Sequence, residues 1–249
     1  MNQNYLPAIV ALFFASPCNA QLNTYDGFEK QELSKIWKSN KLAPNSLEIQ
    51  SQVVHSGKNA AKITLHTGDI YESGNDSSKA SERDELLEAK ELESLEEQKY
   101  AYSFSIFVPD SFPIVPTRLV IAQWKQRCEE NSCQDRSPII AIRYESGELF
   151  ITLQTSLKKE ILYRTKENIK GRWLDLKFKI KFSRGANGSI VAALNNKDII
   201  NYTGITCYGT QYGFATNSSF YFKMGLYRDL IAIPMTIYFD EFSKQKIKE

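Results

Sequence analysis

The sequence contains little histidine and cysteine and has almost no net charge, and each shortage argues against a class of protein. Its 249 residues include 2 His and 4 Cys, and the formal net charge is +2. A balance so close to neutral gives no argument for a nucleic-acid partner, but it leaves room for a local basic patch that meets an anionic ligand. Because the histidines are His55 and His66 and there is no second pair of close cysteines, a zinc site is a poor interpretation.

Long apolar segments are lacking as well. The run from Leu6 to Ala15 is too short to span a bilayer, and no later segment is apolar enough to cross a membrane. Small residues follow this run and end at Ala20, before Gln21, as at a signal-peptide cleavage point. The sequence therefore predicts a signal peptide over 1–20 and a secreted or periplasmic protein with no membrane partner.

Cys18 lies in the predicted signal peptide, and the cysteines that follow it are Cys128, Cys133 and Cys207. The first two are separated by a short polar loop, which could close as a local disulfide in an oxidising compartment. Cys207 would then be the odd thiol.

Short runs with alternating apolar residues dominate the rest of the chain, and 42% of the residues are hydrophobic. Runs of this kind, separated by Gly, Asn, Asp and Ser turns and with no alternation of strands and helices, predict an all-β antiparallel sandwich. No linker or repeat divides residues 21–249, so we expect one domain and a monomer. The predicted strands are 47–54, 60–65, 100–108, 119–124, 139–144, 149–155, 173–182, 190–194, 221–227 and 235–242.

The segment 77–99 allows two interpretations. Its leucine spacing and glutamate content favour a surface helix. The alternative is a strand over 81–86 that presents Arg83 and Glu85 on one face, which leaves 86–98 as a helix or a lid.

The stretch from Tyr221 to Arg228 separates into two faces if it is extended, because side chains alternate along a strand. One face is apolar and suits a core. The other carries two phenols and an ammonium, with a glycine that permits close approach to the backbone. The first face consists of Phe222, Met224 and Leu226, and the second of Tyr221, Lys223, Gly225 and Tyr227.

Two other stretches place polar groups in the same way. Gln123 and Lys125 share a face of the strand predicted from residue 119, and Arg83 and Glu85 share a face of 81–86. If the three strands line one concave sheet, a guanidinium, an amide, ammonium groups and phenols meet in one groove. Such a set suits an acidic sugar.

These three stretches together resemble the motif strands of jelly-roll polysaccharide lyases, in order and in approximate spacing. The resemblance is to alginate lyases with Arg-x-Glu, Gln-x-His and Tyr-x-Lys-x-Gly-x-Tyr, and to the heparin lyase I and glucuronan lyase groups. The matching residues here are Ser-Glu-Arg-Asp-Glu-Leu at 81–86, Gln-Trp-Lys at 123–125 and Tyr-Phe-Lys-Met-Gly-Leu-Tyr at 221–227. The resemblance implies a jelly-roll, concanavalin A-like sandwich with a concave groove, which cleaves an anionic, uronic-acid-containing polysaccharide by β-elimination.

The resemblance also implies roles that the chemistry can accommodate. Elimination removes the C5 proton beside a carboxylate, so the site must neutralise that carboxylate and stabilise the developing charge. Arg83 can bind a carboxylate through two parallel hydrogen bonds, and Gln123 adds a neutral donor. Glu85 belongs to the substrate-binding set.

Proton transfer is assigned to Tyr221, the phenol that the resemblance places at the matching position. A phenol has a pKa of about 10, and an ammonium on the same strand face favours the phenolate. Lys223 is that ammonium, and it also belongs to the substrate-binding set. Tyr227 is assigned to substrate binding.

Lys125 departs from the pattern, because the alginate lyases carry His there. A lysine beside an anionic substrate neutralises charge but makes a poor base. Either one phenol then performs both proton transfers, or His55 reaches the groove from another strand; His66 is the less well placed alternative. The lysine also leaves open a non-catalytic carbohydrate-binding sandwich.

No cofactor is required for this chemistry, but members of this group often carry a structural calcium, for which Asp26, Glu29 and Asp240 offer oxygen ligands near the chain ends. A glycoside hydrolase ranks third among the functions. Sandwich hydrolases typically carry their two carboxylates on a Glu-x-Asp-x-x-Glu strand, which is missing here.

Overall fold

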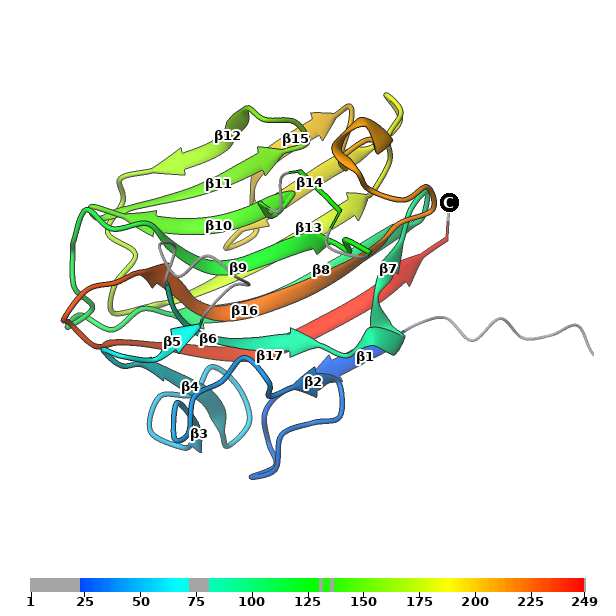
Figure 1. Cartoon of the computed structure of the whole chain (residues 1–249). Coiled ribbons are helices and arrows are strands. Elements are labelled where there is room, and N and C mark those ends of the chain that lie inside the picture. Colours follow the sequence, from blue (N-terminus) through cyan, green and yellow to red (C-terminus); the bar gives the residue numbers. More distant parts are fainter. Residues whose placement is uncertain (1–22, 72–80, 130–131, 135–136, 249) are drawn as a thin grey trace, which may run out of the picture.

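The computed structural model describes residues 23–71, 81–129, 132–134 and 137–248. The predicted signal peptide lies outside these residues. Two antiparallel sheets stack face to face as a sandwich (Figure 1). The predicted all-β sandwich is confirmed. None of the helices in the described ranges is long and apolar enough to cross a membrane.

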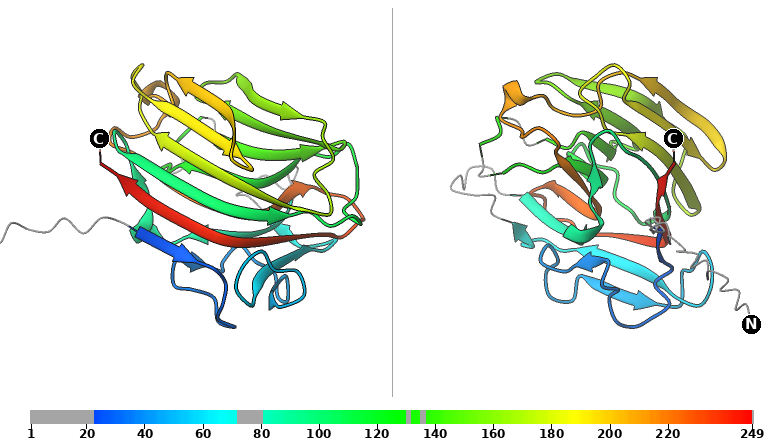
Figure 2. Two further views of the ribbon diagram at one scale, coloured as in Figure 1. Left: turned by 180° about the vertical axis from the view of Figure 1, so that it is seen from behind. Right: turned by 90° about the vertical axis from the view of Figure 1, so that its right-hand side faces the viewer.

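The eight-stranded sheet forms one layer, seen from its own side in the left view of Figure 2. Its central strands are long and its edges are short or exposed. In spatial order it contains β15 (Lys197–Thr203), β14 (Ser189–Leu194), β13 (Trp173–Lys181), β8 (Lys99–Phe107), β17 (Met235–Ile247), β4 (Ala60–Leu65) and β3 (Leu47–Gln50), and β1 (Asn23–Asp26) pairs with β17.

The nine-stranded sheet forms the other layer. Within the described residues, two short 3-10 helices accompany the strands, Lys90–Leu92 and Thr210–Tyr212. In spatial order the sheet contains β12 (Lys159–Thr165), β11 (Glu148–Gln154), β10 (Ile140–Glu145), β9 (Leu119–Gln126), β16 (Ser219–Asp229), β6 (Ser81–Glu88) and β2 (Trp37–Lys38); β5 (Ile70–Tyr71) pairs with β6, and β7 (Ser94–Leu95) pairs with β16.

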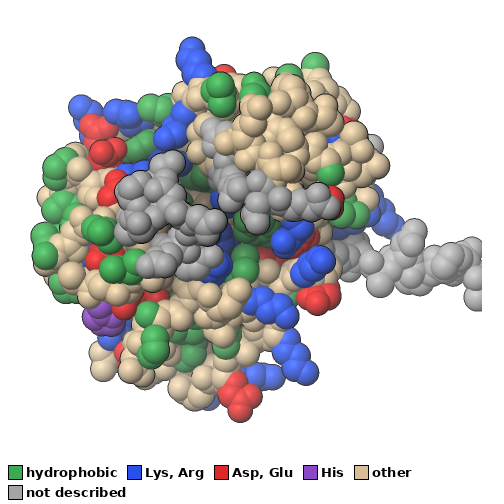
Figure 3. Space-filling model, in the orientation of Figure 1, with side chains coloured by type: hydrophobic (Ala, Val, Ile, Leu, Met, Phe, Trp, Pro, Cys, Tyr) green, Lys and Arg blue, Asp and Glu red, His purple; other side chains and the backbone are tan. Residues whose placement is uncertain are grey.

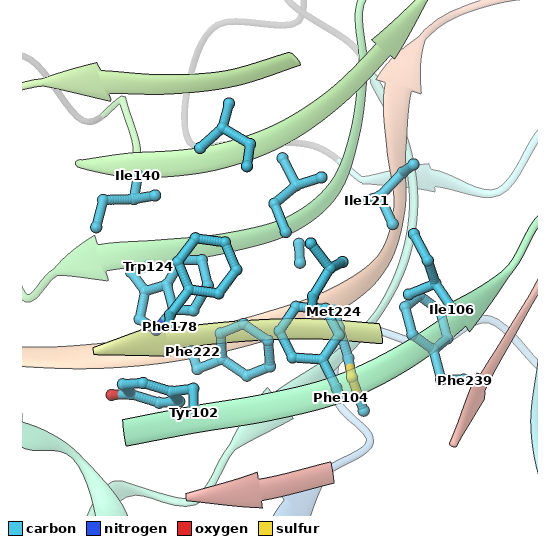
Figure 4. Close-up of a cluster of buried hydrophobic side chains, with 14 of the residues drawn as sticks. Tyr102, Phe104, Ile106, Ile121, Trp124, Ile140, Phe178, Phe222, Met224 and Phe239 are labelled. Carbon is cyan, nitrogen blue, oxygen red and sulfur yellow. The ribbon is translucent and has the colours of Figure 1, made fainter. Parts of the chain in front are cut away.

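The core between the sheets is rich in aromatic rings (Figure 4). The ring centroid of Trp124 lies 4.7 Å from that of Phe178 and 4.8 Å from that of Phe222, and all three side chains are buried. Because Trp124 and Phe222 point inward, their strand neighbours point to the outer face of the nine-stranded sheet. Packing of the core therefore decides which side chains of β9 and β16 face outward.

Most predicted strands are present, within a few residues at their ends. Two long strands were missed, β12 and β15, which lie at the edges of the two sheets. Their residues are largely exposed or half-buried, so they lack the strong apolar alternation on which the prediction relied. The strand predicted over 47–54 ends at Gln50.

The helix favoured for 77–99 is wrong over its described part. Residues 81–88 form strand β6, and only the short turn Lys90–Leu92 is helical. The strand is acidic yet buried, because cations from other strands neutralise three of its four carboxylates, those of Glu82, Glu85 and Glu88. Glu82 lies 2.6 Å from the guanidinium of Arg228 in β16. Tertiary charge pairing thus overrides the helical tendency of the segment.

A second buried ion pair joins the two sheets. Lys244 of β17 lies 2.6 Å from Glu88 of β6, and both residues are buried. The ammonium of Lys244 also lies 5.2 Å from the rings of Tyr100 and Tyr102. Burial raises the pKa of Glu88 and lowers that of Lys244, in each case against the attraction of the partner. The pair therefore depends on both members being present.

We predict that Lys244→Met lowers the free energy of unfolding by about 3 kcal/mol, because it leaves a buried carboxylate without its cation. Urea unfolding followed by circular dichroism measures the change. The double variant Glu88→Gln with Lys244→Met should recover much of the loss. Wild-type stability of the single variant would show that Glu88 does not need its partner.

Candidate active site

The three motif strands lie side by side in the nine-stranded sheet, in the order β9, β16, β6. Residues directly opposite one another on antiparallel strands share a face. The strand register therefore places the motif side chains together on the outer face, here called the site face. The opposed pairs are Tyr227 with Arg83, Gly225 with Glu85, Lys223 with Gln123, and Tyr221 with Lys125.

Figure 3, drawn from the side of the nine-stranded sheet, shows lysine and arginine side chains near the middle of this face. The weak net charge of the whole chain therefore conceals a locally basic surface. Such a surface attracts anions.

Glu85 is the centre of the site. Its side chain is fully buried, with Lys223 Nζ donating to Oε2 at 2.7 Å and Gln123 Nε2 donating to Oε1. Arg83 Nε forms an ion pair at 3.0 Å with Oε2, without the alignment of a hydrogen bond. Burial alone would raise the pKa of Glu85, but the charges of Lys223 and Arg83 outweigh it and lower the pKa. A charged carboxylate thus holds two hydrogen-bond donors and one ion-paired guanidinium.

Lys223 lies equally deep, with 3% of its surface exposed. Burial lowers its pKa to about 8, against the attraction of Glu85. The structure therefore places Glu85, Lys223 and Gln123 deep in the site face, where Lys223 neutralises Glu85 and Glu85 orients Arg83 and the amide of Gln123. The charge of Lys223 is paired with Glu85. The ammonium is therefore less available to stabilise a phenolate at Tyr221 than the sequence predicted.

Gly225 allows this arrangement. Its φ is +148°, and a Cβ atom there would lie 2.1 Å from the carbonyl oxygen of Asp84. The close approach that the glycine permits is therefore that of strand β6. The register of β16 against β9 also shifts between Met224 and Tyr227. A strand without this glycine could not bring Glu85 beneath Lys223.

Tyr227 lies between two guanidinium groups. The Cζ atom of Arg83 is 4.0 Å and that of Arg118 is 4.4 Å from its ring centroid. Burial tends to raise the pKa of Tyr227, but the charges of Arg118 and Arg83, with hydrogen bonds from Arg118 and Ser81, lower it. Burial raises the pKa of five other tyrosines, Tyr25, Tyr100, Tyr102, Tyr144 and Tyr202. Tyr227 differs from them, because its surroundings favour the phenolate.

Tyr221 and Lys125 lie opposite each other farther along the same face, and both are partly exposed. The Cζ atom of Arg127 lies 5.1 Å from the ring centroid of Tyr221. Glu93 anchors this arginine by accepting a hydrogen bond of 2.9 Å from Nε. A second phenol near cations is thus available beside the central network.

Three arginines of this region were not predicted from the sequence: Arg118, Arg127 and Arg143. The sequence could have placed Arg143 on the outer face, because it alternates along β10 with Ile140, Ile142 and Tyr144, which pack in the core. Arg118 and Arg127 lie just beyond the ends of β9, where strand periodicity gives no information.

His55 does not reach the site face. Its Nε2 lies 2.9 Å from Asp175 Oδ1, and its ring meets the edge of Trp173 at 5.3 Å. Asp175 belongs to β13, where Leu174 and Leu176 on either side of it point into the core. Asp175 and His55 therefore lie on the outer face of the eight-stranded sheet, across the sandwich. The suggestion that His55 serves the groove is wrong.

The predicted calcium ligands hold loops instead of forming one cluster. Asp240 accepts hydrogen bonds from the backbone N–H groups of His55 and Ser56, and Glu29 accepts one from Lys58. Asp26 accepts hydrogen bonds from Trp37 and Phe28 elsewhere. Within the described ranges no three His, Cys, Asp or Glu side chains gather to hold a metal ion. The three residues do not fit a common ion, and bound calcium stays a prediction.

Cys128 and Cys133 are joined in a disulfide, which closes the loop that follows β9. Cys207 is a buried thiol, and burial raises its pKa to about 12. It is therefore unsuited to nucleophilic chemistry.

The family described as polysaccharide lyase matches residues 20–243. The chain belongs to the polysaccharide lyase family. No curated protein sequence matches it.

Several solved structures share the fold. An endo-β-1,4-glucuronan lyase from the fungus Trichoderma reesei is 16% identical, with a TM-score of 0.69 and coverage of 90% of this chain and 95% of that one. The alginate lyase AlgAT5 of polysaccharide lyase family 7 is 16% identical, with a TM-score of 0.55 and coverage of 83% and 85%. A cellulose-induced protein, Cip1, is 13% identical, with a TM-score of 0.56 and coverage of 89% and 96%. At these identities the likeness shows the jelly-roll sandwich alone.

We predict that Gly225→Ala abolishes activity and lowers stability, because the new Cβ would force β6 away from β16 and separate Glu85 from Lys223. Product formation and thermal unfolding measure the two effects. Gly68→Ala is the matched control, since its φ is also positive, at +94°, but its Cβ would meet no atom within 4 Å. Equal effects in both variants would contradict a specific role for the strand approach.

Proposed function

We propose that the protein cleaves a uronic-acid-containing anionic polysaccharide by β-elimination on the site face. The observation that carries the proposal is that one face of the sheet carries Arg83, Gln123, Lys125 and two tyrosines, with Arg83 and Gln123 held by the buried carboxylate of Glu85. Elimination beside a carboxylate requires positive charge at the acid and a group that moves protons. The site supplies both.

Arg83, Gln123 and Lys125 would bind the carboxylate of the reacting sugar. Arg83 and Gln123 are oriented by Glu85, so little reorganisation is needed when the charge grows in the transition state. Lys125 adds a cation from the next position on β9, in the place where alginate lyases carry histidine. It acts here as a neutralising group and not as the base.

A phenolate would then take the C5 proton, the electrons form the C4–C5 double bond, and the C4–O4 bond breaks as O4 receives a proton. Tyr221 is the phenol predicted from the sequence. Tyr227 is the phenol whose pKa is lowered, by Arg118 and Arg83 against the effect of burial. We propose Tyr227 as the base, with Tyr221 at the neighbouring end of the site.

The test is the ultraviolet absorbance of the unsaturated product from a panel of glucuronan, alginate, heparin-type and chondroitin-type chains. We expect product from at least one polymer with uronic acids. Retardation in polymer gels without any product would instead identify a non-catalytic carbohydrate-binding protein. The absence of both product and retardation would overturn the proposal.

The variants Tyr227→Phe and Tyr221→Phe distinguish the roles of the two tyrosines. Loss of the base should reduce kcat by at least about 100-fold with little change in KM. We expect this of Tyr227→Phe, and a smaller effect of Tyr221→Phe. The opposite order would return the role to Tyr221. Because the phenolate is the active form, the wild-type rate should rise with pH through the lowered pKa of Tyr227.

A further inference from the structure

Arg143 of β10 is a buried cation on the site face that the elimination scheme does not use. Across the sheet, Arg143 pairs with Val120 of β9, Val120 pairs with Tyr227 of β16, and Tyr227 pairs with Arg83 of β6. These residues form one row across four neighbouring strands. Arg143 is therefore two strand spacings, about 10 Å, from Tyr227.

The surroundings of Arg143 differ from those of the other buried cations. Lys223, Lys244 and Arg228 each lie within 2.7 Å of a buried carboxylate. Arg143 is 6% exposed, yet no carboxylate of the described chain is within ion-pair distance of it. A buried charge without a counter-ion is costly unless a ligand supplies one.

The side chain is held in place for such a ligand. Its Nε donates a hydrogen bond of 3.2 Å to Thr152 of β11, which fixes the direction of the guanidinium. The terminal nitrogens make no hydrogen bond to a residue in the described ranges. Burial and the like charge of Arg118 lower the pKa of Arg143 to about 10, and the opposing influence of Tyr227 and Glu145 does not outweigh them. The group is still a cation at neutral pH.

We propose that Arg143 binds the carboxylate of the sugar next to the reacting one, so that the enzyme selects polymers with uronic acids in adjacent positions. The inference rests on the proposed function, in which Arg83 and Gln123 hold the carboxylate of the reacting sugar. A pyranose unit is similar in length to one strand spacing, so a neighbouring carboxylate falls within reach of the long arginine side chain. An alternating polymer of uronic acid and amino sugar would leave Arg143 without its anion.

The variant Arg143→Gln removes the charge and keeps a donor. On a polymer of contiguous uronic acids we expect KM to rise about 10- to 100-fold with kcat nearly unchanged. Arg143→Lys should raise KM less, and it replaces the glutamine variant in the test if that variant does not fold. Arg164→Gln is the matched control, because Arg164 lies farther along the same row, exposed and paired with Glu148 at 3.0 Å. It should leave KM unchanged.

Partial reduction of the polymer's carboxylates to alcohols tests the adjacency directly. If two neighbouring carboxylates are needed, reducing half of them at random should lower the wild-type kcat/KM about fourfold but that of Arg143→Gln about twofold. An unchanged KM in Arg143→Gln, a loss confined to kcat, or the same dependence on reduction in both enzymes would overturn the inference.

Failure of the proposed function can be told apart from failure of this inference. If the wild-type protein binds polyuronate in affinity electrophoresis but forms no product, elimination is excluded while the role of Arg143 is still measurable. Loss of retardation in Arg143→Gln, with retention in Arg164→Gln, would support the anion site. Equal retardation of wild type and Arg143→Gln would overturn it.

Discussion

The arrangement of the site depends on one buried charge, the carboxylate of Glu85. Burying a carboxylate costs several kcal/mol unless cations and donors compensate it. The compensation comes from Lys223 on β16, Gln123 on β9 and Arg83 on β6 itself. Because these groups belong to three strands, the same interaction stabilises the middle of the sheet and directs donors toward the outer face.

The opposite side of β6 repeats this principle, with Glu82 and Glu88 paired to Arg228 and Lys244. Those pairs are structural, since they lie inside the sandwich and satisfy one another. On the site face Arg83 and Arg118 pair with Glu85 and Asp229 and also lie against the ring of Tyr227. Their charges lower the pKa of this phenol, and Arg143 lies beyond it without an ion-paired carboxylate among the described residues.

The interior strands were predictable because their apolar residues alternate strongly and the core requires that alternation. The edge strands β12 and β15 were not, since half-exposed strands need little apolar surface. The acidic segment 81–88 was favoured as a helix because its leucines and glutamates are good helix formers. No local rule could reveal that Arg228 and Lys244, more than a hundred residues away, would neutralise it.

The sequence by itself determined which side chains share a face, because two-residue periodicity follows from backbone geometry and needs no neighbours. It thereby grouped Tyr221, Lys223 and Tyr227, and it carried the family likeness. Tertiary structure alone decided which of these groups are accessible: it buried Lys223 against Glu85, gathered arginines that belong to no motif, and placed His55 across the sandwich. Burial and charge compensation arise from contacts between distant segments, which local sequence does not encode.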